Sequence, residues 1–385
     1  MSATLMVVLC TVMLALLHAY IMRGWGDALE RSSHAVDEQG LQGTTGLSVI
    51  VPVRNEEDNI LPCLQDLYVQ KDRSQLDVIV VDDRSTDRTA ERVRGLKARW
   101  AELRLEQLGE HQGKKAAIEL GMERAVHPVV LLTDGDTRCS QDRTTCIRRA
   151  WSTDAPHLLV LPVFMDEGAG WLARYQRQEQ AALLAVAAGS ALQGHALLAN
   201  GANLAVDRDV FRELGGYAQD RHWASGDDMF LLQAMRRSGR KVRYLADRAA
   251  AVTVRPETTW AGWWAQRLRW AGKMRAYRSP GAWAFGVIAI GLPWWLFGLT
   301  WSIVYTVRVG DALLYTWSML VFAWCAWLFP TLALVRAGNR FQRSPSNTLL
   351  STLALIQFVA LAPVIAVAGM FFRTRWKGRP VRVAP

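Results

Sequence analysis

The sequence predicts an α/β domain with a mostly parallel sheet, flanked by transmembrane helices at both ends of the chain. Two observations predict it: β-type and helical runs alternate between residues 47 and 97, and four long uncharged runs lie outside this region. Such alternation is typical of parallel strands joined by crossover helices. With 385 residues, 51% of them hydrophobic, and a net charge of +10, the chain is too apolar and too basic for an ordinary cytosolic enzyme.

The four uncharged runs are each long enough to cross a hydrocarbon core of about 30 Å. They cover residues 2–22, 283–307, 312–335 and 348–372. The first run lacks a basic start and an obvious cleavage site, so we expect a retained anchor rather than a signal peptide. The predicted organisation is an anchor at 1–23, the α/β domain at 24–255, an interfacial helix region at 256–280, about three membrane segments at 281–372 and a basic tail at 373–385.

Basic residues beside the first two spans place the domain on the cytoplasmic side of the cell membrane by the positive-inside rule. The loop 336–343 and the tail 373–385 are both basic, so the last run cannot have both ends inside if it crosses once. Pro363 within this run leaves a re-entrant hairpin open. Attraction to anionic lipid headgroups explains these basic residues, and we therefore expect no nucleic-acid partner.

Within the domain, residues 47–53 and 77–81 are predicted strands, and 56–70 and 86–97 are predicted helices. Asp82 and Asp83 follow the second strand, where exposed amides of the next helix favour anions or a nucleotide. The alternative is that both carboxylates only cap this helix. Further on, Lys114 follows Gly113 without the spacing of a P-loop. It could approach a diphosphate as a point charge, although a solvated lysine is the simpler interpretation.

A third predicted strand, 129–133, delivers Asp134 and Asp136 to its carboxyl end, where ligands of open α/β sheets bind. Two carboxylates so close repel each other unless a cation lies between them. Hard oxygen ligands suit Mg²⁺ or Mn²⁺ that also bind phosphate oxygens. An isolated Asp-Gly-Asp can equally form a solvated turn, so the neighbouring motifs must decide between the two.

The stretch 258–277 combines tryptophan with arginine and lysine. This composition is typical of a helix that lies in the membrane interface. A plain amphipathic core helix is the alternative. An interfacial helix would place the site at the bilayer surface, where a lipid hydroxyl gains from the position and a water-soluble acceptor does not.

Seven short motifs follow one another in a specific order along the chain. They lie at 50–57, 81–87, 113–114, 134–136, 200–203 and 226–228, and at Gln266, Arg269 and Trp270 in the pattern Gln-x-x-Arg-Trp. This ordered set, over about residues 47–273, resembles the membrane-anchored branch of the family 2 glycosyltransferases. That branch has the GT-A fold and includes ceramide glucosyltransferases and relatives of cellulose and hyaluronan synthases.

The resemblance implies a role for each motif. The implied donor-binding residues are Pro52, Val53, Arg54, Glu56, Asp82, Asp83, Lys114, Asp134, Gln266, Arg269 and Trp270. Asp136, helped by Asp134, would bind Mg²⁺ or Mn²⁺, and Asn203 and Trp270 would lie on the acceptor side. Asp228 would be the general base. Asp227 is a second catalytic candidate, although a helix-capping carboxylate is the simpler interpretation.

The function implied is inverting, metal-dependent transfer of a hexose from a nucleotide sugar, with UDP favoured, to the hydroxyl of a membrane lipid. A processive β-polysaccharide synthase is the alternative, but three C-terminal spans look few for a glycan path. A non-catalytic membrane scaffold is disfavoured because the whole set of acidic residues is present.

Overall fold

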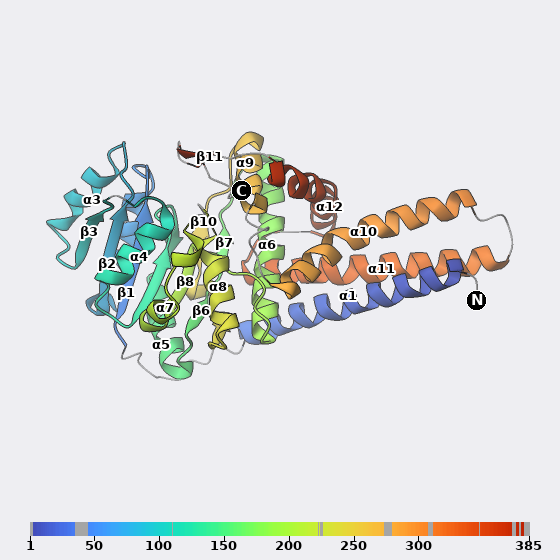
Figure 1. Ribbon diagram of the computed structural model, residues 1–385, viewed down its shortest axis with the longest axis horizontal. Helices are drawn as coiled ribbons and strands as arrows, with labels where there is room; N and C mark the ends of the chain where they lie inside the picture. The colour runs from blue at the N-terminus through green and yellow to red at the C-terminus, as the bar shows by residue number, and fades with distance from the viewer. Residues whose placement is uncertain are drawn as a thin grey trace.

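The protein consists of an α/β domain from which long helices project to one side (Figure 1). The computed structural model describes residues 3–34, 45–109, 111–221, 223, 226–272, 279–306, 311–345, 347–371, 375–376 and 379–380. The predicted α/β class is confirmed.

A seven-stranded sheet forms the centre of the domain, in the order β3-β2-β1-β4-β8-β6-β9. Its strands are β1 (Leu47–Val53), β2 (Leu76–Asp82), β3 (Leu103–Gln107), β4 (Val129–Thr133), β6 (Leu158–Val160), β8 (Asn203–Asp207) and β9 (Val242–Tyr244). β1 pairs in parallel with β2 and β4, and Leu47 lies opposite both Leu76 and Val129. β8 runs antiparallel to β4 and β6. The carboxyl ends of β1, β2 and β4 therefore share one edge.

A smaller sheet adjoins the first, in the order β5-β10-β7. Its strands are β5 (Arg138–Cys139), β7 (Val163–Met165) and β10 (Val252–Val254). The helices of the domain are α2 (Ile60–Tyr68), α3 (Thr89–Lys97), α4 (Lys114–Arg124), α5 (Arg143–Asp154), α6 (Gly170–Leu192), α7 (Arg208–Glu213), α8 (Asp227–Arg237) and α9 (Trp260–Gly272).

Helices cover both faces of the large sheet, which explains the continuous apolar runs of its central strands. On one face, Leu64 of α2 and Ile147 of α5 belong to a buried cluster with alternate residues of β1 and β2. On the other face, Ile118 of α4, Leu184 of α6 and Leu231 of α8 form a second cluster.

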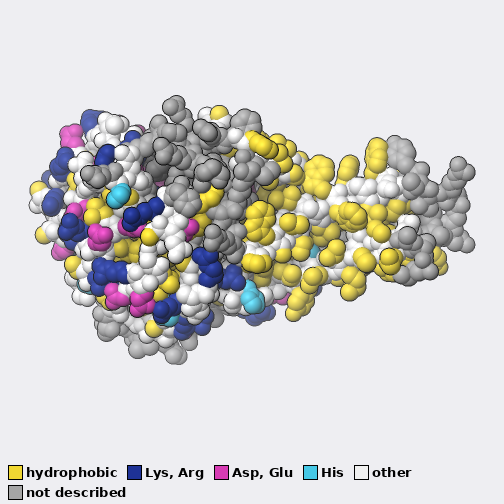
Figure 2. Space-filling view, viewed as in Figure 1, with side chains coloured by type: hydrophobic (Ala, Val, Ile, Leu, Met, Phe, Trp, Pro, Cys, Tyr) yellow, Lys and Arg dark blue, Asp and Glu magenta, His cyan; other side chains and the backbone are white. Residues whose placement is uncertain are grey.

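Four described helices are long and apolar enough to cross a membrane, as the sequence predicts. They are α1 (Ala3–His34), α10 (Pro280–Thr306), α11 (Asp311–Phe341) and α12 (Thr348–Phe371). Exposed apolar side chains gather on these helices, whereas charged side chains gather on the domain (Figure 2). α1 continues well beyond the predicted end of the anchor.

The second apolar cluster extends into the membrane helices. Trp25 and Leu29 of α1 and Leu334 and Phe341 of α11 are buried in it together with residues of α6. Figure 1 shows α6 crossing the ends of α1 and α11 that lie next to the domain. The core of the domain is therefore completed by helices that are long and apolar enough to cross a membrane.

Pro363 lies inside α12, which runs unbroken from Thr348 to Phe371. The re-entrant hairpin considered from the sequence is therefore not formed in this segment. Of the predicted interfacial region, residues 273–278 lie outside the described residues. So does the basic tail, apart from the paired strands β11 (Arg375–Trp376) and β12 (Arg379–Pro380).

The contact between α6 and α11 predicts opposite effects for two glycine substitutions. Gly338→Ala should lower the thermal unfolding temperature, because the new methyl group would overlap the carbonyl of Ala181 in α6. Overpacking of this kind costs about 1–3 kcal/mol. Gly298→Ala in α10 has open space around it and should leave the temperature unchanged or raise it, since alanine favours a helix. Thermal unfolding of the purified proteins in detergent compares the two, and an equal response would contradict the close α6–α11 contact.

Candidate active site

The loops after β1 and β2 are joined by buried polar side chains. The Arg54 guanidinium donates to the backbone carbonyls of Asp83, at 2.6 Å, and Arg84, at 2.8 Å. The Asp83 carboxylate accepts from the amide of Gly113, at 3.1 Å, and Asp82 accepts from the amide of Ser85, at 3.0 Å. These three side chains are buried. They fix the edge of the sheet where the resemblance places the donor nucleotide.

Capping of α3 is not the role of this acidic pair. α3 begins at Thr89, later than predicted, and the carboxylates of Asp82 and Asp83 bond Ser85 and Gly113 instead. The capping alternative considered from the sequence is therefore wrong for both residues.

Asp134 and Asp136 lie in a tight turn directly after β4. Its closing bond runs from the Thr137 hydroxyl to the carbonyl of Asp134, at 2.8 Å. A Cβ atom at Gly135 would lie 2.8 Å from Val53 Cγ1 and 3.6 Å from Glu56 Cγ, so any larger residue here would displace the Val53 side chain. The turn is thereby held against β1, whose residues Pro52 and Val53 were predicted to bind the donor.

The turn could hold a divalent cation together with a phosphate-bearing ligand. The Asp136 side chain is exposed and that of Asp134 is partly exposed, so both carboxylates are accessible hard ligands. No group of three or more His, Cys, Asp or Glu side chains among the described residues is placed to hold a metal ion. A cation here would therefore take part of its coordination from the ligand and from water, as Mg²⁺ commonly does.

Lys114, the first residue of α4, contacts two carboxylates. Its Nζ lies 2.7 Å from Asp134 Oδ1 and 3.2 Å from Asp227 Oδ2. The side chain is only 19% exposed, so the expectation of a solvated lysine is wrong. Burial alone would lower the pKa of Lys114, but the attraction of Asp134 and Asp227 raises it above its ordinary value. The ammonium therefore stays charged.

The same burial acts on Asp134 in the opposite sense. Burial raises the pKa of Asp134 to about 6, Lys114 partly offsets the rise, and the nearby charge of Asp136 adds to it. A positive charge beside the turn therefore stabilises the ionised form of a carboxylate that its surroundings otherwise disfavour.

Asp227 and Asp228 begin α8 and have different surroundings. Gly226 precedes them with a φ of 91°, a conformation that glycine adopts without strain. Asp227 is buried and faces Lys114, an ion pair that the helix-capping interpretation did not include. The carboxylate of Asp228 accepts from the amides of Gly201, at 3.2 Å, and Met229, at 2.7 Å. Two backbone donors thus fix its orientation.

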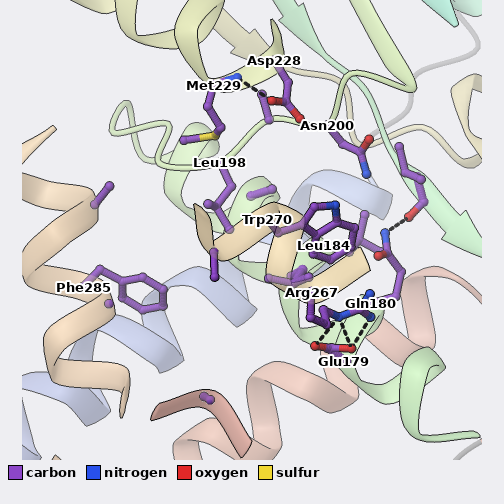
Figure 3. Close-up of a pocket in the computed structure, with 18 of the residues that line it drawn as sticks. Glu179, Gln180, Leu184, Leu198, Asn200, Asp228, Met229, Arg267, Trp270 and Phe285 are labelled. Atoms are coloured by element: carbon purple, nitrogen blue, oxygen red, sulfur yellow. Dashed lines mark hydrogen bonds and ion pairs between the residues drawn. The ribbon is translucent and has the colours of Figure 1, made fainter. Parts of the chain in front are cut away.

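A pocket of about 390 Å³ connects Asp228 with the membrane helices. Asp228, Asn200 and Trp270 line it near the domain (Figure 3). Apolar residues of α10 and α12 line the far part, among them Phe285, Ile290, Phe358, Ala362 and Ile365, and residues of α6 and of the sheet line the remainder. The cavity therefore extends from a carboxylate to apolar side chains of two helices that are long and apolar enough to cross a membrane.

The three residues of the Gln-x-x-Arg-Trp motif in α9 do not all line the pocket. Trp270 lines the pocket, whereas neither Gln266 nor Arg269 is among its described lining residues. Gln266 accepts from Arg267. Arg269 is half-buried, and this burial lowers its pKa below the ordinary value.

A buried ion pair that the sequence did not predict holds α9 against α6. Arg267 Nε lies 3.0 Å from Glu179 Oε1, and its guanidinium lies 4.2 Å from the centre of the Trp270 ring. Figure 3 shows this pair beside Trp270 at the pocket. The pair fixes the Trp270 ring, which borders the pocket. Glu179 lies in α6 next to Arg177 and three glutamines, so no pattern along the chain distinguishes it as the partner of Arg267.

Asn203 was expected on the acceptor side of the site, and this expectation is wrong because the residue lies in the core. It is fully buried, accepts from Arg143, at 2.8 Å, and donates to the carbonyls of Pro162, at 2.7 Å, and Ala250, at 3.0 Å. Its amide is satisfied by protein groups alone. Asn200, from the same motif, lines the pocket instead.

Comparisons with known proteins agree with this geometry. Residues 48–215 match the family model for glycosyl transferase family 2. The chain is 28% identical over 247 residues to the probable glycosyltransferase YdaM of Bacillus subtilis (strain 168), covering 58% of this chain and 54% of that protein. It is 34% identical over 100 residues to the 4,4'-diaponeurosporenoate glycosyltransferase of Staphylococcus haemolyticus (strain JCSC1435), covering 26% of each.

In structure, the chain is similar to the mannosyltransferase PcManGT from Pyrobaculum calidifontis, solved in complex with GDP-Man and Mn²⁺. The TM-score is 0.56 at 19% identity, covering 94% of this chain and 98% of that one. This similarity confirms the GT-A-like fold. The chain spans about half the length of YdaM and about a quarter of the S. haemolyticus protein. The narrower resemblance to ceramide glucosyltransferases and polysaccharide synthases stays a prediction.

Lys114→Met tests the charge balance of the site. Without the ammonium, Asp134 and Asp227 face each other without compensation, and breaking a buried pair costs about 3–5 kcal/mol. The variant should therefore unfold at a lower temperature in EDTA, and Mn²⁺ should raise that temperature more than in the unsubstituted protein.

Lys97→Met on α3, where the side chain is exposed, is the matched control and should unfold like the unsubstituted protein. Unfolding temperatures are compared with and without Mn²⁺. If both lysine variants behave alike, Lys114 does not stabilise the carboxylates.

Proposed function

We propose that the protein, whose residues 48–215 match the family model for glycosyl transferase family 2, transfers a hexose from a nucleotide sugar to the hydroxyl group of a membrane lipid. The observation that carries the proposal is the pocket shared by Asp228 and the apolar residues of α10 and α12. The domain is proposed to lie on the cytoplasmic side of the cell membrane, where the positive-inside rule places it.

The donor is proposed to bind along the carboxyl ends of β1, β2 and β4. The loop formed by Arg54, Asp82 and Asp83 would hold the nucleobase. UDP is favoured by the family resemblance, and GDP is the alternative because PcManGT was solved with GDP-Man. Gln266 and Arg269 are retained as diphosphate-binding candidates from the Gln-x-x-Arg-Trp pattern.

Asp136 and Asp134 are proposed to hold Mg²⁺ or Mn²⁺ together with the donor diphosphate. PcManGT was solved with Mn²⁺, and the accessible carboxylates of this turn fit such a cation. The cation would neutralise the charge of the departing diphosphate. Lys114 contacts Asp134 and would contribute a fixed positive charge on the same side.

Asp228 is proposed to take the proton from the acceptor hydroxyl as that oxygen attacks the anomeric carbon. Attack on the face opposite the leaving diphosphate inverts the configuration of that carbon. Two backbone amides hold the Asp228 carboxylate, so little reorientation is needed. Trp270 borders the same pocket and would form the roof over the acceptor hydroxyl.

The apolar lining supports a lipid acceptor over a polysaccharide. A glycan carries many hydroxyl groups, and burying each without a hydrogen-bond partner is costly. The part of the pocket between α10 and α12 presents mainly hydrocarbon side chains, which suit an acyl or isoprenoid chain. The processive synthase remains the second candidate because the resemblance includes such enzymes.

The decisive experiment incubates membranes containing the protein with Mn²⁺ or Mg²⁺ and radiolabelled UDP- and GDP-sugars. Product partitioning then separates the two functions. Label in the organic phase supports lipid glycosylation and identifies the sugar, whereas label in insoluble polymer would replace the proposal with the processive synthase. Membranes that contain the Asp228→Asn variant serve as the negative control for transfer.

Substitutions of Asp228 and Asp136 should impair different steps of the proposed reaction. Asp228→Asn should lower transfer by about 10²- to 10⁴-fold, the range of general-base catalysis, while donor binding remains. Asp136→Ala should weaken metal-dependent donor binding itself. Calorimetric titration with the nucleotide diphosphate, beside the transfer assay, separates these effects. Full activity in both variants would refute the assignment of the site.

A bulky residue in the pocket tests the acceptor route. Ala366 of α12 lines the pocket, whereas Ala360 of the same helix is exposed. Ala366→Phe should raise the KM for the lipid acceptor about tenfold or more, because the phenylalanine ring would fill part of the pocket that the acceptor occupies. The KM for the donor should stay unchanged. Ala360→Phe should change neither value. Equal KM values in both variants would show that the acceptor binds elsewhere.

A further inference from the structure

Helix α12 differs from the other membrane helices in where its ends lie. α1, α10 and α11 each have one end at the domain and the other far from it (Figure 1). Their far ends meet in a cluster of Val8, Ile303 and Leu320, well away from the sheet. A helix that crosses a bilayer from the domain is expected to separate its ends in this way.

The first half of α12 contacts α6 of the domain. The Ser351 hydroxyl donates to Gln178 Oε1, at 2.9 Å, and the Trp171 indole donates to Gln357 Oε1, at 2.7 Å. Ala354 is buried against Leu172 and Trp263. Ser351 and Gln357 of this uncharged helix thus bond side chains of the domain.

The last turns of α12 contact α9 of the domain. A Cβ atom at Gly369 would lie 2.6 Å from the Ala271 Cβ and 3.2 Å from the Gly272 nitrogen, so the two helix backbones approach each other closely. Both ends of α12 are therefore at the domain. At about 1.5 Å per residue its 24 residues span about 36 Å, and a full crossing would take one end far from both α6 and α9.

The remaining surface of α12 is apolar. Figure 1 shows the helix running across the direction of α1, α10 and α11. Its exposed large side chains are Leu349, Leu353, Ile356, Val364, Val367 and Phe371. A surface of this kind with no charge in residues 348–371 fits hydrocarbon rather than water or headgroups.

We propose that α12 lies within the hydrocarbon region of one leaflet, packed along the base of the domain, and does not cross the bilayer. The described helices then cross three times, through α1, α10 and α11. The chain after α12 is then on the side of the domain, so the basic segment 336–343, which contains the end of α11, and the basic tail 373–385 are both on the side that the positive-inside rule requires. The proposal does not depend on the enzymatic activity.

The test places one epitope tag at a time in the full-length chain: after Gly40, after Gly310 or after Pro385. Antibody binding is measured on sealed vesicles of both orientations. The tag after Gly40 reports the side of the domain, and the tag after Gly310, between α10 and α11, reports the opposite side. The tag after Pro385 should be accessible in the same orientation as the tag after Gly40 and inaccessible in the other.

Accessibility of the Pro385 tag together with the Gly310 tag would overturn the proposal, because α12 would then cross. Thermal unfolding of each tagged protein in detergent verifies that the tag leaves the fold intact. A fourth tag after Pro345, ahead of α12, must match the Gly40 tag under either topology. A change of side between Pro345 and Pro385 therefore reports on α12 alone.

Discussion

The candidate site depends on the two ion pairs that the ammonium group of Lys114 forms. The ammonium contacts Asp134 after β4 and Asp227 at the start of α8, and so joins three segments that are distant in the chain. Carboxylates brought this close in a partly dry site repel each other strongly unless a positive charge compensates them. With the ammonium present, the proposed cation side and the proposed base side are held in one fixed arrangement before any ligand binds.

A second charged contact connects this site with helix α6, which packs against the candidate membrane helices. Glu179 of α6 and Arg267 of α9 are buried together, and the guanidinium packs on Trp270. α6 also contacts α1, α11 and α12, through the backbone at Gly189 and Gly338 and through Gln178. One helix thus contacts the pocket, the candidate membrane helices and the sheet, so packing against α6 fixes the position of the pocket relative to those helices.

The sequence predicted those parts of the fold whose cause is local. The strand 47–53 was correct in both bounds because a buried parallel strand is a continuous apolar run, and the order of acidic motifs located the residues near the sheet edge. Side-chain partners could not be predicted this way. Asn203 is satisfied by Arg143, and Lys114 by Asp227; both pairs are created by tertiary packing, which a pattern along the chain does not contain.

The shared apolar cluster has a consequence for biogenesis. Trp25 and Leu29 emerge early from the ribosome, whereas Leu334 and Phe341 emerge near the end of synthesis, yet all four are buried around α6. The α/β domain therefore cannot close its core when its own last strand is complete. Part of its apolar surface stays exposed until α11 has been synthesised and inserted into the membrane. Maturation of the domain is in this way made dependent on successful membrane insertion, and a chain that fails to insert stays incompletely folded.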